Sequence, residues 1–406
     1  MKVLFIVTAY PRHEGDIITP WMGETIERLM ATGTHVEVLA PSYKGSSSGP
    51  VGGVMVHRFR YAPAALETLT HDMPAVERIK RSPAFLALLP SYVAAGSAAA
   101  ARIARDGGFD VVHAFWPIPH GLFGAAARSR SRAALVSTFF SAELTWSGLA
   151  RRTFAPLIRK IVAASDAVTV ISSYTLKRLH EYAPSVSAVT IPFGAAAVER
   201  SAAERGEANE PRTASEPFEL LFVGRLVERK GVDVLLRAVK LLEADPRLSV
   251  TVVGGGPEKA RLESLALGLG VEKKVAFDGV VSAEAIEGRF ARCDALVLPA
   301  IVTSTGDTEG LGVVLIEAMG YGKPVIASAA GGIVDIVEQG ETGLLVGPGD
   351  PDALAAAIRR AMDEPETMAR LAAQGREFAA KAFGWDEIIS RLSATYHSAV
   401  AARTGS

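Results

Sequence analysis

The sequence predicts an α/β protein made of two Rossmann-like halves. Short β-rich runs alternate with helical stretches over residues 1–192, which is typical of parallel sheets joined by crossover helices. The alternation stops over 195–217, which is rich in Ala, Glu, Arg and Ser and has no apolar periodicity. It then resumes, and 406 residues are enough for two domains of ~100–200 residues. The expected organisation is a first domain over 1–194, a linker over 195–217, a second domain over 218–384, and a helix over 385–406 that packs back on the first domain.

Each half has its own series of elements. In the first half, strands are expected at Val3–Val7, His35–Leu39, Val111–His113, Leu135–Thr138, Val168–Ile171 and Ala188–Ile191, and helices at Met22–Ala31, Val93–Arg105 and Tyr174–Tyr182. In the second half, strands are expected at Leu220–Val223, Leu248–Val253, Val275–Phe277, Ala295–Leu298, Pro324–Ala327 and Gly343–Val346, and helices at Gly231–Glu243, Glu258–Leu267, Ala283–Arg292, Val313–Tyr321 and Pro351–Asp363. A cleft between two such halves is the expected ligand site.

Composition and charge exclude several classes of protein. With 49% hydrophobic and 21% charged residues the chain is not disordered, and its net charge of -1 excludes a histone-like nucleic-acid binder. The single cysteine, Cys293, excludes internal disulfides and zinc sites built on several cysteines. We therefore expect a reducing, cytoplasmic compartment and no nucleic-acid partner.

The charge is distributed unevenly along the chain. Residues 1–192 carry 20 Lys+Arg and 13 Asp+Glu, whereas the remainder carries 23 and 31. The apolar run Val3–Val7 is too short for a signal peptide and indicates a buried strand. Ser82–Ala101 is uncharged and long enough to cross a membrane, but Pro83 and Pro90 interrupt it and small residues dominate it. We do not expect it to span a bilayer.

The strongest candidate site is a glycine-rich segment that leads into an apolar helix. Gly310 and Gly312 precede the expected helix start at Val313, where backbone amides can face an anionic ligand. Glu309 and Glu317 flank this helix start, so a carboxylate at each end can hold hydroxyl groups. The helix is otherwise apolar, which makes Glu317 an acid on a largely buried element. The structural alternative is an exposed glutamate on an ordinary helix.

A second candidate loop follows the expected strand Leu220–Val223. Arg225 and Lys230 stand at the carboxyl end of that strand and are suited to neutralising a diphosphate, although a solvated charged loop has the same composition. The glycine turn Gly254–Gly256 follows the next strand. Lys259 occupies the third glycine position of the dinucleotide fingerprint, so we do not predict a nicotinamide cofactor or a dehydrogenase.

The segment Asp350-Pro351-Asp352 matches an Asp-x-Asp metal pattern. A proline in the first turn after an acid is also an ordinary helix start, and we expect that structural role here. The sequence has no Walker loop, nucleophile elbow or His-Glu-x-x-His helix.

Taken together, these motifs resemble the retaining glycosyltransferases of family 4, which have the GT-B fold, two Rossmann-like domains facing each other across a cleft. The resemblance covers most of the chain and is most specific over 220–350. It rests on Gly224-Arg225-Leu226, Lys230-Gly231, the turn at 254–257, Phe277-Asp278-Gly279, Glu309-x7-Glu317 and Gly331-Gly332-Ile333-x-Asp335.

The resemblance implies transfer of a sugar from a nucleotide-diphosphate sugar with retention of configuration, without a metal or other cofactor. Arg225 and Lys230 would bind the donor diphosphate, Glu309 the sugar hydroxyls and Glu317 the ribose. The leaving phosphate would take the acceptor proton. The remaining donor contacts would come from backbone at Gly15, Gly254, Gly256, Gly310, Leu311, Gly312 and Val313, with the base near Phe277–Val280.

The first half departs from the family pattern. Where the family usually has Thr-x-His-Gly-x-Asp, this chain has Phe140 in place of the histidine and Glu143 in place of the aspartate. Both are expected on the acceptor side. His113 and His120 lie nearby and are candidates for proton transfer, although a lone histidine is more often structural.

The acceptor is poorly specified, and we expect a saccharide or lipid-linked saccharide. Basic residues alternate with apolar ones over 78–89 and 146–160, where Trp146 lies, which favours docking on an anionic membrane from the cytoplasmic side. Two ordinary surface helices are the alternative. A non-catalytic sugar-nucleotide-binding or partner subunit is the main alternative function, because Phe140 replaces the histidine. An epimerase or phosphorylase of the same fold is less favoured by Glu309-x7-Glu317.

Overall fold

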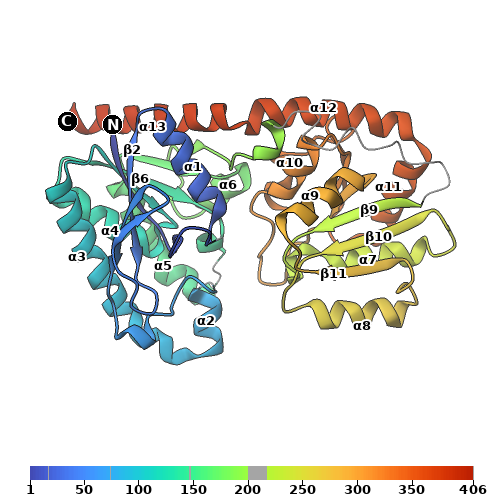
Figure 1. Ribbon diagram of the computed structural model, residues 1–406, viewed down its shortest axis with the longest axis horizontal. Helices are drawn as coiled ribbons and strands as arrows, with labels where there is room; N and C mark the ends of the chain where they lie inside the picture. The colour runs from blue at the N-terminus through green and yellow to red at the C-terminus, as the bar shows by residue number, and fades with distance from the viewer. Residues whose placement is uncertain (17, 74, 146–147, 200–216, 406) are drawn as a thin grey trace. The chain divides into compact units, whose positions relative to one another are not determined.

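The computed structural model describes the chain except for residues 17, 74, 146–147, 200–216 and 406 (Figure 1). Most of the expected linker, and Trp146, therefore lie outside the described residues. The described chain forms two compact units. Unit 1 comprises Met1–Ile171, Thr175–Ile191 and Ile389–Ser406, and unit 2 comprises Ser172–Tyr174 and Pro192–Ile388.

Unit 1 is built on an eight-stranded sheet of order β3-β4-β2-β1-β5-β6-β7-β8. Its strands are β1 (Lys2–Ile6), β2 (His35–Pro41), β3 (Gly49–Val51), β4 (Val54–Phe59), β5 (Val111–Phe115), β6 (Ala134–Phe139), β7 (Ala167–Val170) and β8 (Val189–Thr190). Every described strand pair is parallel except β3 with β4, which is antiparallel. The strands β3 and β4 are additions to the predicted series.

Helices pack on this sheet and bury its apolar residues. They are α1 (Pro20–Ala31), α2 (Ala75–Arg81), α3 (Leu89–Gly107), α4 (Pro117–Arg130), α5 (Gly148–Ala164) and α6 (Ser173–His180). The helices α3 and α4 lie very close together. A Cβ placed on Gly96 of α3 would stand only 2.3 Å from the Phe123 ring of α4, so a glycine is needed at this contact. Tyr92 and Phe123 form part of the core beneath them.

The segment Pro83–Gly107, which includes α3, is long and apolar enough to cross a membrane by length and composition alone. Only 17% of its most apolar window is buried. One face of α3, which carries Tyr92, Ala100 and Ile103, packs into the core of unit 1. This packing is typical of a helix that covers a sheet.

Unit 2 has a six-stranded sheet of order β11-β10-β9-β12-β13-β14, and all its described pairs are parallel. The strands are β9 (Phe218–Val223), β10 (Leu248–Val253), β11 (Val275–Gly279), β12 (Ala295–Leu298), β13 (Val325–Ser328) and β14 (Leu344–Val346). The helices are α7 (Val232–Leu241), α8 (Lys259–Leu269), α9 (Ala283–Arg292), α10 (Val313–Gly320), α11 (Pro351–Asp363) and α12 (Pro365–Phe383).

Helix α13 (Trp385–Thr404) follows α12 and continues into unit 1 from Ile389. Trp385 is buried at its start, and a Cβ on Gly194 would stand 2.5 Å from the Trp385 ring. Short 3₁₀ turns complete the fold: η1 (Ala64–Leu66), η2 (Pro83–Leu88), η3 (Ala142–Leu144), η4 (Ala196–Glu199), η5 (Glu228–Lys230) and η6 (Gly331–Asp335).

Candidate functional site

The site residues of unit 2 lie on loops at one edge of its sheet. The strand order places β9 between β10 and β12, so the crossover direction changes beside β9. Ligands of open parallel sheets bind at the carboxyl ends of strands next to such a switch point. The loop after β9 carries Arg225 and Lys230, and the loop after β12 carries Glu309. The topology therefore brings the two sequence motifs to the same edge.

The pair Lys230 and Glu309 is the central electrostatic feature of this edge. The Lys230 Nζ lies 2.6 Å from the Glu309 Oε2, and each side chain is only 12% exposed. Burial is the largest single influence and raises the pKa of Glu309, but the Lys230 ammonium, the Arg229 charge and the Leu311 amide together hold this pKa below its ordinary value. Glu309 is therefore an anion at neutral pH, and the two charged heads are held in a largely dehydrated place.

Glu317 lies on α10, close to this pair. Burial raises its pKa to about 7, and the opposing effect of the Lys230 charge is smaller. Half of such groups are protonated near neutral pH, so Glu317 can switch between donating and accepting a hydrogen bond. The two glutamates thus have pKa values shifted in opposite directions, although only eight positions separate them in the sequence.

The start of α10 is open to an anion. Its N-cap residue, Gly312, has a positive φ of 99° and provides no side-chain cap. The first amides of a helix have no acceptor within the helix and carry partial positive charge. Gly310 and Val313 contribute backbone here, whereas the Leu311 side chain is 2% exposed and packs inward. This arrangement suits a phosphate or a sugar hydroxyl.

The glycines of the edge have a packing role. A Cβ on Gly254 would stand 1.9 Å from the Gly224 oxygen, and one on Gly256 would stand 2.2 Å from the Leu226 oxygen. The glycine turn after β10 therefore lies directly against the loop that carries Arg225. Gly331 and Gly332 pack in the same way on the backbone of Glu309 and Gly310, with Cβ distances of 1.8 and 2.2 Å. These contacts are the physical reason for the glycines.

An exposed apolar side chain completes the edge near the glycine turn. Val280 directly follows β11 and is 84% exposed. Its Cγ2 would lie 2.9 Å from a Cβ on Gly255. An apolar residue at this position offers a surface for a flat aromatic base. Arg225 lies on the neighbouring loop with its side chain exposed.

Unit 1 concentrates backbone strain at one edge of its own sheet. Among the described residues, the non-glycine residues with positive φ are Thr19, Lys44, His71, Trp116 and Ser141. They follow β1, β2, β4, β5 and β6 respectively, which are neighbouring parallel strands. Such conformations cost about 1–3 kcal/mol each and gather at functional sites. The carboxyl edge of unit 1 is therefore a second candidate binding surface.

The loop after β1 is fastened by two arginines. Arg12 donates from Nε to the Asp16 Oδ2 at 2.6 Å, and this hydrogen bond lowers the pKa of Asp16 to about 2. Arg58, on β4, is largely buried and donates to the carbonyl oxygens of Tyr10 at 3.0 Å and Pro11 at 2.6 Å. Burial lowers its pKa to about 10. Arg58 is not among the predicted site residues, because β4 is not among the predicted strands.

Gly15 lies within this fastened loop. Its φ is 84°, and a Cβ placed on it would meet no atom within 4 Å. The glycine is therefore needed for the backbone conformation, and its surroundings leave room for a ligand. Asp16, which replaces a second glycine of the family pattern, serves as the partner of Arg12.

His113 and His120 lie inside the core of unit 1, which does not fit the prediction of proton transfer. The His113 ring nitrogens pair with the Tyr396 hydroxyl at 2.8 Å and the Thr138 hydroxyl at 2.6 Å. Those of His120 pair with the Phe115 carbonyl at 2.7 Å and the Tyr92 hydroxyl at 3.2 Å. Burial lowers the two pKa values to about 3 and about 4. Both imidazoles are neutral and fully engaged, so we assign them structural roles.

Phe140 and Glu143 lie together at the carboxyl end of β6. The Phe140 amide donates to the Glu143 Oε1 at 2.9 Å, and the buried Oε2 has no hydrogen-bond partner within the described residues. Burial raises the pKa of Glu143 to about 7. Glu143 therefore supports the turn at Phe140 from inside the domain.

Asp350 is an N-cap, as expected, because its Oδ1 accepts from the Ala353 amide at 2.9 Å. No group of three or more His, Cys, Asp or Glu suited to a metal is found in the part of the chain that the structure describes.

Comparison with known proteins agrees with this architecture. Residues 21–195 match the family model for Glycosyltransferase Family 4, and residues 205–378 match that for Glycosyl transferases group 1. A GDP-mannose-dependent alpha-(1-6)-phosphatidylinositol monomannoside mannosyltransferase of Mycolicibacterium smegmatis is 30% identical over 345 residues, covering 82% of this chain and 88% of that protein. The chain belongs to the family 4 glycosyltransferases.

Two further similar proteins align with nearly the whole length of this chain. The corresponding mannosyltransferase of Mycobacterium tuberculosis is 28% identical, with 97% of each chain covered. The structure of sucrose-phosphate synthase from Thermosynechococcus elongatus has a TM-score of 0.76 and 25% identity, with 99% of each chain covered. The predicted GT-B fold and the use of a nucleotide-sugar donor are thereby confirmed.

Proposed function

We propose that this enzyme transfers a mannosyl group from GDP-mannose to a hydroxyl of a lipid-linked saccharide, with retention of configuration and without a metal. The observation that carries the proposal is the buried Lys230–Glu309 pair beside the uncapped start of α10. The full-length relatives that use GDP-mannose support the choice of donor and the glycolipid acceptor.

In the proposed complex, Arg225 and Lys230 neutralise the diphosphate, and the first amides of α10 hold phosphate and sugar. Glu309 accepts hydrogen bonds from the sugar hydroxyls, and Glu317 holds the ribose. The base lies against Val280 and the glycine turn after β10. Charge neutralisation by two fixed cations is the reason to propose metal-independent transfer.

Retention follows if the acceptor oxygen attacks the anomeric carbon from the same face from which the diphosphate leaves. The bond between the sugar anomeric carbon and the diphosphate oxygen breaks while the bond to the acceptor oxygen forms on the same face. The acceptor hydroxyl proton passes to the departing diphosphate oxygen. No histidine is required for this step, which agrees with the core positions of His113 and His120.

A nucleotide panel tests the donor site. We expect GDP and GDP-mannose to raise the melting temperature, while UDP, ADP, TDP and NAD have little effect. A ligand at 100 times its dissociation constant stabilises the folded state by about 2.7 kcal/mol. Radiolabelled transfer from GDP-mannose to extracted lipids, followed by the anomeric configuration of the product, then tests the reaction and its stereochemistry. A shift with GDP but no transfer to any acceptor would favour the alternative of a sugar-nucleotide-binding partner subunit.

We also propose that unit 1 docks on an anionic membrane from the cytoplasmic side. Arg152, Arg159 and Lys160 are exposed on α5 and have no ion-pair partner among the residues described. Leu86, in η2, is 51% exposed, and the Arg78 guanidinium lies 5.4 Å from the Phe85 ring centre. Each unpaired cation near an anionic surface contributes about 1 kcal/mol.

Liposome flotation tests the membrane proposal. We expect the protein to float with vesicles that contain phosphatidylglycerol at low salt, and to be released at high salt or with neutral vesicles. Replacing Arg152, Arg159 and Lys160 by alanine should reduce the floated fraction, with the nucleotide-induced melting shift unchanged. Recovery of all the wild-type protein in the soluble fraction at low salt would refute docking.

A further inference from the structure

Four aromatic side chains gather at the carboxyl ends of β5 and β6. Trp116 and Phe140 stack with their ring centres 4.4 Å apart and their planes 21° apart. The Trp21 ring, from the start of α1, lies 5.8 Å from both. Phe115 packs 6.2 Å from Phe140. Phe140, one member of this aromatic platform, stands where the family pattern has its histidine.

Trp21 and Trp116 are the two half-buried members of the platform. Phe140 is 8% exposed and lies in the interior, whereas Trp116 is half-buried. Trp116 has φ 50° and ψ 74°, a left-handed conformation that is strongly disfavoured for so bulky a residue. Its stacking on Phe140 and its contact with Trp21 would hold an aromatic ring here, but they do not by themselves require the strained backbone. Strain of this kind is maintained where a side chain must meet a ligand.

The support beneath Trp116 is rigid. Glu143 accepts from the Phe140 amide at 2.9 Å, and the Ser141 hydroxyl lies 2.5 Å from that of Thr175. Ser141 itself has φ 80°. These contacts hold the Phe140 ring in place, so the flat surface of Trp116 is formed before any ligand arrives.

We propose that Trp116 stacks on the six-membered polyol ring of the acceptor and thereby determines acceptor specificity. The inference rests on the proposed function. A pyranose or cyclitol ring has an apolar face of C–H groups, and a flat aromatic surface is its natural partner, while the hydroxyls around its rim remain free for polar contacts. Phe140 is then a positioning residue that supports Trp116, and this explains why an aromatic residue stands in place of the histidine.

Saturation-transfer NMR with the full-length protein and GDP tests the proposal without requiring turnover. The probes are methyl α-D-mannopyranoside and myo-inositol, with sodium octanoate as the comparison for an acyl chain. We expect saturation to reach the ring C–H protons in the wild type. The signal should fall at least fivefold in Trp116→Leu and stay within twofold of wild type in Trp116→Phe. Phe378→Leu, at a half-buried aromatic residue of unit 2, is the matched control and should leave it unchanged.

Turnover provides the second readout. In Trp116→Leu the KM for acceptor should rise about tenfold, while the GDP-induced melting shift stays at the wild-type value. Equal saturation transfer in the wild type and Trp116→Leu, or a signal from octanoate but from neither ring, would overturn the proposal. Ring binding that depends on Trp116, in a protein that transfers no sugar, would refute the proposed function and leave the stacking site standing.

Discussion

Lys230→Ala is expected to slow sugar transfer by at least about 100-fold and to destabilise unit 2. The alanine removes a cation proposed to bind the diphosphate, and loss of one such group typically lowers kcat by about 10²–10³-fold. It also leaves the Glu309 carboxylate buried without its counter-ion, and breaking a buried pair from one side costs about 3–5 kcal/mol. Initial rates with GDP-mannose and urea unfolding measure the two effects.

A second substitution separates the two effects. Lys230→Ala with Glu309→Gln removes both charges, so it should recover much of the lost stability and none of the transfer. Lys240→Ala is the matched control, because Lys240 pairs with Glu243 on an exposed part of unit 2. We expect it to change stability by less than about 1 kcal/mol and to leave transfer unchanged. Near wild-type transfer in Lys230→Ala would contradict the proposed donor site.

The sheet of unit 2 could be predicted closely from sequence because its strands are short apolar runs with clear ends. The predicted bounds Leu248–Val253 and Ala295–Leu298 are those observed for β10 and β12. Parallel strands buried on both faces produce this signal. The two strands at one edge of the sheet of unit 1, β3 and β4, could not be predicted in this way. The strand β3 consists of Gly49-Pro50-Val51, a composition typical of turns, and it is a strand only through its antiparallel pairing with β4.

Helix α4 was also absent from the prediction, for a related reason. Gly121 and Gly124 interrupt its apolar pattern and indicate a loop by composition. In the structure each glycine admits a neighbour: a Cβ on Gly121 would stand 2.5 Å from Ile161, and one on Gly124 would stand 2.4 Å from Leu135. Tertiary packing determines these positions, and a single sequence does not contain that information.

The residues of the candidate site also differ in how well the sequence predicts them. Lys230 and Glu309 lie in the loops that directly follow two predicted strands, so topology alone brings these loops to one edge of the sheet. The role of His113 depends on a partner far along the chain, since its Nδ1 bonds Tyr396 on α13. Arg58 could not be placed without β4. Residues whose chemistry depends on long-range packing were therefore missed or misassigned.

Glu317→Gln is expected to stabilise the protein above neutral pH while weakening nucleotide binding. Burial raises the pKa of Glu317 to about 7, so between pH 4.5 and 7 the folded state binds a proton that the unfolded chain has lost. Stability from this group is complete below pH 4.5 and is lost as the pH rises toward 7. Glutamine is neutral throughout, so at pH 8 the variant should gain about 3 kcal/mol, and the two proteins should converge near pH 4.5.

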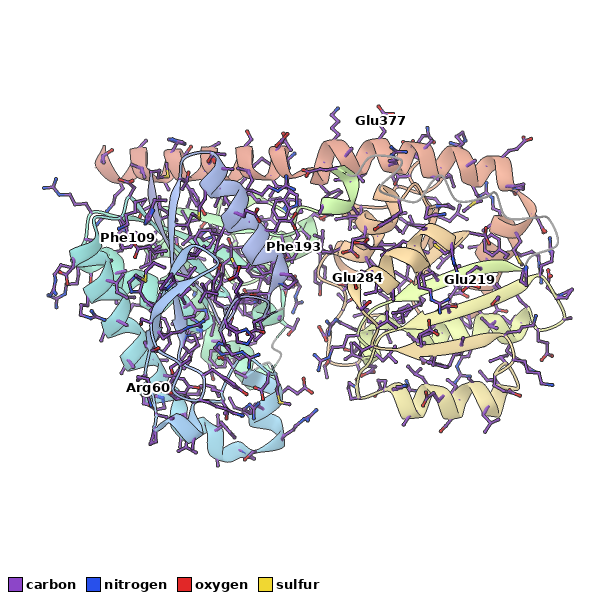
Figure 2. All side chains as sticks on the ribbon, in the orientation of Figure 1. Arg60, Phe109, Phe193, Glu219, Glu284 and Glu377 are labelled. Atoms are coloured by element: carbon purple, nitrogen blue, oxygen red, sulfur yellow. The ribbon has the colours of Figure 1, made fainter. Side chains whose placement is uncertain are left out.

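The same substitution is expected to weaken donor binding. Loss of a charged acceptor for the ribose hydroxyls should weaken GDP binding about 10–100-fold, because hydrogen bonds to charged groups contribute about 1.5–3 kcal/mol. The apo melting temperature at pH 8 should thus rise while the GDP-induced shift falls. Glu377→Gln is the matched control, since Glu377 points away from unit 2 on the outer side of α12 (Figure 2). A stabilised variant with unchanged GDP affinity would mean that Glu317 is a buried acid without a part in donor binding. Opposite changes in the two measurements would mean that the domain tolerates a destabilising carboxylate at this position because the donor needs it.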